Sequence, residues 1–149
     1  MKFAKYILSV STLAMAVTAP QAFAGNSAGA TTNQPQYNQA TVVDVIGMVT
    51  GVRQVSSGNP LAGSHLTVKS KTGTLDVYLG PADFLKFLKA SFTVGEQIEV
   101  IGSKVKFENA DVILTQQVND GLELVTLRDP DGSAEWQSWG KEIDPTLVQ

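Results

Sequence analysis

The amino-acid sequence predicts a mainly β domain, a Greek-key barrel of five to six strands with one short helix between the third and fourth strands. From residue 40 onward, most segments are rich in Val, Ile and Thr and alternate between apolar and polar side chains, which is typical of half-buried strands. Turn-forming residues separate these segments, and only residues 81–89 change to helical spacing. With 43% apolar residues in 149, the chain is long enough for one compact core.

The first predicted strand, residues 41–55, is long and contains two glycines. Gly47 and Gly51 lie where a strongly bent strand loses side chains. We therefore expect a curved strand that serves both sides of the barrel, followed by a loop over residues 56–63.

Residues 64–70 and 74–79 form the predicted second and third strands, joined by a turn at residues 71–73. Successive side chains of a strand point to opposite faces, so each strand has an inward and an outward set. The inward set is Leu66, Val68, Leu75, Val77 and Leu79. The outward set is His65, Thr67, Lys69, Thr74, Asp76 and Tyr78.

A short helix is expected after Gly80, because Pro81 suits a first helical position and Asp83 is favoured near the positive end of the helix dipole. Helical spacing then predicts a buried apolar stripe that plugs the open end of the barrel. The stripe consists of Phe84, Phe87 and Leu88.

Three more strands are expected, over residues 97–107, 110–118 and 122–128. In the first of these the apolar positions change parity at Gly102-Ser103, which indicates a bulge or sharp bend. This order of elements matches the five-stranded barrel called the OB-fold. A small two-sheet sandwich is the main alternative.

Four segments also resemble small exported bacterial OB-fold proteins, a family that includes magnetosome-associated members. They are GSHLTV (63–68), VYLGPADFL (77–85), GEQIEVIGS (95–103) and LRDPDG (127–132), the last leading to Trp136. The likeness covers about residues 42–139 and implies the fold and export. It carries no catalytic residue, and Asp83 stands where the family pattern suggests an aromatic residue.

The N-terminus has the features of a secretory signal. A basic start is followed by an apolar run and by Ala22-Phe23-Ala24, which fits the cleavage rule, so residues 1–24 are expected to be removed. The apolar run is too short for a membrane helix, and we expect a periplasmic or secreted protein with no membrane span. Residues 25–39 are expected to form a flexible tail, the domain to cover residues 40–139, and residues 140–149 to form a second tail. Alternatively, the first tail is an arm that pairs with another molecule, places Tyr37 in a pocket and allows oligomers.

Composition excludes several classes of function. The chain has no cysteine and one histidine, so thiolate metal sites, disulfides and thiol nucleophiles are excluded. Without residues 1–24, nine basic side chains face fourteen acidic ones. Binding to nucleic acid or to anionic membranes is therefore disfavoured, because both depend on positive charge.

His65 is the main candidate for chemistry, as a general base or as a haem or metal ligand. A solvated or hydrogen-bonded histidine on the outward face is the simpler interpretation. Ser64 cannot complete a catalytic triad with it, because neighbouring strand residues point to opposite faces. We expect no catalytic residue, cofactor or metal site.

Two further groups have simple structural interpretations. Asp129, Asp131 and Glu135 could bind calcium, but Asp-Pro-Asp-Gly is more typical of a turn. Trp136 and Trp139 could stack on a sugar or base, but such a pair more often clamps a terminal turn onto the barrel.

The sequence therefore predicts a soluble, exported binding or assembly module without catalytic activity, whose partner is a protein or small ligand of the cell envelope. The exterior of the second and third strands is the usual recognition face of an OB-fold, so the binding residues would be the outward set. That face could also be merely solvated. The other two hypotheses are a periplasmic haem or metal accessory protein using His65 and a structural subunit that pairs through residues 25–39.

Overall fold

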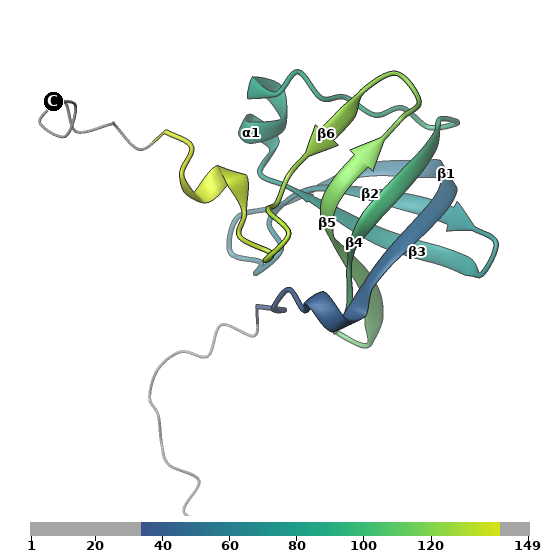
Figure 1. The fold of residues 1–149 in the computed structure, drawn as a ribbon, viewed down its shortest axis with the longest axis horizontal. Helices are drawn as coiled ribbons and strands as arrows, with labels where there is room; N and C mark the ends of the chain where they lie inside the picture. The colour runs from purple at the N-terminus through teal and green to yellow at the C-terminus, as the bar shows by residue number, and fades with distance from the viewer. Residues whose placement is uncertain (1–33, 141–149) are drawn as a thin grey trace, which may run out of the picture. The chain divides into compact units, whose positions relative to one another are not determined.

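A single six-stranded sheet closes into a barrel in the computed structural model, which describes residues 34–140 (Figure 1). The sheet order is β3-β2-β1-β4-β5-β6, and a parallel pairing of β3 with β5 closes it. The strands are β1 (Val42–Val55), β2 (Gly63–Ser70), β3 (Gly73–Gly80), β4 (Gln97–Phe107), β5 (Ala110–Asn119) and β6 (Leu124–Thr126). Helix α1 (Ala82–Phe87) lies between β3 and β4, and the 3-10 turns η1 (Gln39–Thr41) and η2 (Glu135–Gln137) flank the barrel strands in sequence.

This architecture confirms the predicted fold class: five strands form the closed barrel and β6 is the additional strand. β6 is shorter than the predicted strand over residues 122–128. The alternative of two separate sheets is wrong, because the β3–β5 pairing closes the strands β3-β2-β1-β4-β5 of one sheet into a barrel.

β1 is the curved strand that its glycines predict. Its first half pairs with β4 and its second half with β2, and the register shifts between Val49 and Gly51. A Cβ atom on Gly47 would lie 2.5 Å from Val68 Cγ1 and 2.7 Å from the carbonyl oxygen of Lys69. Only glycine therefore lets β1 approach β2 so closely at the bend.

The barrel interior is filled by the alternating apolar side chains of all five barrel strands, as predicted. The buried members on β2 and β3 are Leu66, Val68, Leu75, Val77 and Leu79. In the middle of β4, the register with β5 shifts between Ile101 and Gly102, which confirms the predicted break at Gly102-Ser103.

A second, smaller apolar cluster lies outside the barrel. Its buried members are Leu61, Tyr78, Val112 and Leu114, and its half-buried members are Tyr37, Val105, Phe107 and Trp136. Beyond the break in β4, Val105 and Phe107 contribute to this cluster, whereas Ile98 and Val100 belong to the interior. The change of parity in the sequence therefore marks a change from one core to the other.

The buried face of α1 differs from the prediction. Phe84 and Leu85 are buried and Leu88 is half-buried, but Phe87 is 62% exposed. At 100° per residue, positions 84, 85 and 88 share one face, whereas position 87 lies to its side. The helix also ends at Phe87, and Lys89 already has a φ of 56°, so no further turn covers that side chain.

The N-terminal segment is described from Gln34 onward, and these residues are not a free tail. Tyr37 packs against Gly132, and its hydroxyl donates a hydrogen bond to Gln116 Oε1 at 3.2 Å. Residues 25–33, the expected signal peptide (1–24) and most of the expected C-terminal tail lie outside the described residues. No helix within residues 34–140 is long and apolar enough to cross a membrane.

Candidate binding face

The six predicted site residues lie together on the outer face of the β2–β3 hairpin. The strand register pairs His65 with Tyr78, Thr67 with Asp76, and Lys69 with Thr74. β1 extends the face on the other side of β2, because Met48 pairs with Lys69 and Arg53 with His65. The predicted parity is therefore correct for both strands of the hairpin.

Two of the six residues are nevertheless buried. The exposed fraction is 2% for His65 and 5% for Tyr78, so the expectation that both are open to a partner is wrong. Residues Leu61 and Ala62 of the β1–β2 loop, together with Trp136, cover this end of the face. Strand parity determines which face a side chain occupies, but a distant segment determines whether that face meets solvent.

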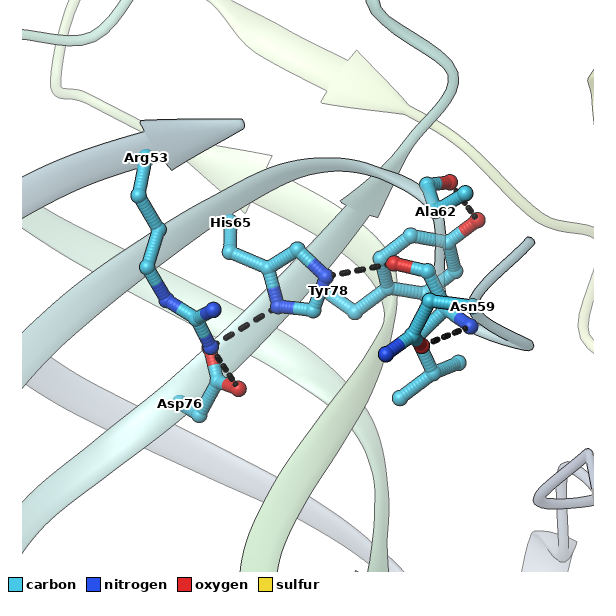
Figure 2. A network of polar contacts seen from close by, with 7 residues as sticks. Arg53, Asn59, Ala62, His65, Asp76 and Tyr78 are labelled. Atoms are coloured by element: carbon cyan, nitrogen blue, oxygen red, sulfur yellow. Dashed lines mark hydrogen bonds and ion pairs between the residues drawn. The ribbon is translucent and has the colours of Figure 1, made fainter. Parts of the chain in front are cut away.

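His65 joins the loop to the hairpin through both of its ring nitrogens (Figure 2). Nε2 donates to the carbonyl oxygen of Leu61 at 2.7 Å, and Nδ1 lies 3.0 Å from Asp76 Oδ1. Asn59 Oδ1 in turn accepts a hydrogen bond from the backbone N–H of Leu61 at 2.8 Å. With both nitrogens engaged and the ring buried, His65 presents no free lone pair for a metal, a haem or a substrate proton.

Asp76 links the buried histidine to an exposed arginine. Its Oδ2 lies 2.6 Å from an Nη atom of Arg53, whose side chain is 51% exposed. The Asp76 side chain is only 22% exposed, and its other oxygen is held by His65. The contact therefore fixes the guanidinium of Arg53 at the surface, as Figure 2 shows.

Tyr78 holds the second part of the same loop. Its hydroxyl donates to the carbonyl oxygen of Ala62 at 3.1 Å, and its ring packs against His65 and edge-on against Trp136. Burial raises the pKa of the Tyr78 phenol, and the positive charge of Arg128 opposes this increase in part. Tyr78 is thus a packing residue that holds the β1–β2 loop against this end of the hairpin.

The accessible part of the face has a mixed basic and apolar character. We call it the β1–β3 face and define it by the exposed residues Met48, Arg53, Lys69 and Thr74. Thr67 and Asp76 lie between them and are half-buried. Among residues 34–140, Lys69 takes part in no ion pair. Met48 and Arg53 were missed from the sequence because the register shift in β1 hides which of its residues flank the hairpin.

The other two candidate groups have structural roles. Asp131 Oδ1 accepts a hydrogen bond from the backbone N–H of Ser133 at 2.8 Å, as in an ordinary turn. Among residues 34–140, no three His, Asp or Glu side chains gather closely enough to hold a metal ion. Trp136 packs against Tyr78 and Phe84, and Trp139 against Phe84 and Phe87, so the pair clamps the C-terminal segment onto the barrel.

Comparison with known proteins gives one result for the whole domain. No curated protein matches the chain. Residues 41–125, more than half of the chain, match the model of the MamS/MamX magnetosome protein family. This match covers the barrel from the start of β1 into β6, including the β1–β3 face. The chain therefore belongs to the MamS/MamX magnetosome protein family.

Proposed function

We propose that this protein is a binding or assembly module of the cell envelope, without catalytic activity, that holds an acidic partner against its β1–β3 face. The observation that carries the proposal is the position of Arg53, which is held at the surface by Asp76, itself bound to the buried His65. Lys69 lies on the same face and takes part in no ion pair within residues 34–140. A charged group that is already ordered loses little conformational freedom on binding. A partner therefore meets a prepared basic site.

The distribution of charge supports the choice of partner. The chain carries an excess of acidic side chains, yet this face presents Arg53 and Lys69, with Lys71 exposed in the adjoining turn. Asp76 lies between Arg53 and Lys69 and is occupied by Arg53. Asp44 lines the same hollow as Lys71, so Lys71 adds less to the positive charge of the face than Arg53 and Lys69 do. A basic face on an acidic protein favours an acidic surface and repels a basic one, which sets specificity and the rate of association. Met48, 51% exposed, adds an adaptable apolar contact at the same place.

The proposed absence of catalysis rests on the geometry of His65 and Ser64. Both nitrogens of His65 are engaged, and Ser64 is 5% exposed and accepts a hydrogen bond from Gln54 Nε2 at 2.6 Å. Neither group is placed to attack a substrate or to transfer its proton. Because both nitrogens of His65 are engaged, the residue is not available to bind a haem iron or another metal, which argues against the haem or metal hypothesis. Export follows in the proposal from the signal-like residues 1–24 and agrees with the magnetosome family.

Affinity capture with charge-reversed variants tests the function. The protein is used to capture partners from the native cell envelope, and the captured proteins are identified by mass spectrometry. We expect Lys69→Glu to reduce capture of the main acidic partner at least tenfold, because it replaces an attraction by a repulsion. Lys86→Glu is the matched control, since Lys86 lies on α1, is equally a surface lysine and is away from the face. Equal capture by both variants would exclude the β1–β3 face as the recognition site.

A further inference from the structure

A second site is suggested by Arg128, whose side chain is partly buried between the C-terminal turn and the N-terminal segment. Arg128 follows β6, and its guanidinium carbon lies 4.7 Å from the centre of the Trp136 ring. One Nη atom donates to the carbonyl oxygen of Gly132 at 3.0 Å. The Nε atom is buried and has no hydrogen-bond partner within the described part of the chain. A buried N–H without a hydrogen-bond acceptor lowers the stability of the fold, and the surroundings of Arg128 lack a polar partner for its Nε.

The positive charge of Arg128 also lacks a counter-charge. None of the ion pairs formed within residues 34–140 includes it. The neighbouring phenols of Tyr37 and Tyr78 do not supply one, because burial raises the pKa of both and keeps them neutral at neutral pH. An arginine does not lose its proton in a protein, so the charge remains and its partial burial is uncompensated. The Trp136 ring offsets only part of that cost.

A cavity of about 310 Å³ lies beside this guanidinium. The N-terminal segment forms one wall and the turn after β6 forms another, and the packing of Tyr37 on Gly132 holds the two together. The lining residues that matter for a ligand are Tyr37, Arg128, Asp131, Ser133 and Gln137. Ser133 and Gln137 add a hydroxyl and an amide, which are neutral groups able to donate hydrogen bonds.

Asp131 is the carboxylate on this cavity wall, and its negative charge lowers the affinity of the cavity for an anion. Hydrogen bonds from Ser133 lower the pKa of Asp131, so the group is ionised at neutral pH. It is exposed at the rim and is used by the turn, and it does not pair with Arg128. Its charge weakens the attraction for an anion without removing it.

We propose that this cavity is a binding site for a small oxyanion, a carboxylate or a phosphate, with Arg128 as its main ligand. Arg128 lines the cavity, and its guanidinium fork presents parallel N–H groups that match two oxygens of either anion. Ser133 and Gln137 would complete the coordination. The site is independent of the β1–β3 face, because it uses neither Arg53 nor Lys69.

Ligand titrations of the full chain test this site. Sodium phosphate and sodium succinate are titrated separately, with sodium chloride at matched ionic strength as the reference, and binding is followed by thermal unfolding and calorimetry. We expect a saturable rise in Tm with phosphate or succinate beyond that given by chloride. The stronger of the two arms identifies the chemical source of the oxyanion.

Three variants decide whether the anion is held by the proposed ligands. We expect Arg128→Lys, which keeps the charge but loses the fork, to weaken binding about tenfold. Asp131→Asn should strengthen it, because it removes the negative charge at the rim. Lys106→Gln should leave anion binding unchanged, because Lys106 does not line this cavity. Equal Tm responses in all variants, or no response beyond chloride in the original protein, would overturn the proposal.

Discussion

At the scale of single residues, His65 and Tyr78 show how a polar strand face is turned into part of the core. Both side chains are buried, and each donates a hydrogen bond to a backbone carbonyl of the β1–β2 loop. His65 bonds to Leu61, and Tyr78 bonds to Ala62. Buried polar groups without such partners destabilise a fold. The two hydrogen bonds therefore attach the loop to the hairpin and, through Asp76, hold Arg53 in place.

Tyr78 makes the stability of the protein sensitive to alkaline pH. Burial raises the pKa of Tyr78 in the folded state above its ordinary value of 10.0. Above pH 10 the unfolded chain releases the phenolic proton while the folded protein still retains it. The free energy of unfolding therefore decreases as pH rises through the folded pKa. Below pH 10 both states are neutral and this contribution is fully present. Urea unfolding between pH 8 and 11 should show the decrease.

Tyr78→Phe is the variant that isolates this effect. At pH 8 it should lower the free energy of unfolding by about 1 kcal/mol, because the hydrogen bond to Ala62 is lost. It should also flatten the alkaline decrease, leaving the part due to Tyr37, whose pKa burial also raises. An alkaline decrease that is unchanged in Tyr78→Phe would show that another group causes it.

At the scale of elements, the curvature of β1 depends on its two glycines to different degrees. A Cβ atom at Gly47 would lie 2.5 Å from Val68 Cγ1 and 2.7 Å from a backbone oxygen, so β1 and β2 would have to separate. At Gly51 the nearest atom is Thr67 Oγ1 at 3.3 Å, which can move. We expect Gly47→Ala to lower the free energy of unfolding by about 1–3 kcal/mol, the usual range for overpacking. Chemical denaturation measures it.

Gly51→Ala is the matched control for that prediction, because it lies in the same strand and adds the same methyl group. We expect it to change the free energy of unfolding by less than about 1 kcal/mol. If Gly47→Ala were as stable as Gly51→Ala, the close approach of β1 to β2 at the bend would not be what requires glycine.

The elements also show how much of the structure the sequence predicts. Period-two alternation predicts the interior positions of β2 and β3, and the change of parity at Gly102-Ser103 predicts where β4 leaves the interior. Phe87 was misplaced because a helix of six residues has too few positions to define its buried face. The sequence suggests that Trp136 clamps a terminal turn onto the barrel. Leu61, Tyr37 and Trp136 nevertheless lie in loops or short turns without periodicity, so the sequence does not indicate which face they cover. The burial of His65 and Tyr78 was therefore not predictable.

At the scale of the whole molecule, the C-terminal segment joins the two cores. Trp136 packs against both clusters: it contacts Phe84 of the interior and Tyr78 of the outer cluster. It also stacks with Arg128 and lies over Gly80, where a Cβ atom would come within 2.7 Å of its ring. The covered end of the β1–β3 face and the Arg128 cavity thus depend on the same side chain.

Truncation of the two tryptophans should separate this role from surface packing. We expect Trp136→Ala to lower the free energy of unfolding by about 3 kcal/mol, because it opens a cavity between the two cores. Trp139→Ala should lower the free energy of unfolding by about 1 kcal/mol or less, since Trp139 is 39% exposed and packs against Phe84 and Phe87 of α1. Denaturation followed by circular dichroism measures both variants without relying on the fluorescence that each removes.

In Trp136→Ala, amide hydrogens of the β1–β2 loop should also exchange faster, because Tyr78 loses the ring that packs against it. Similar losses of stability in the two variants would mean that the C-terminal segment is held by its surface contacts and not by Trp136 as the link between the cores.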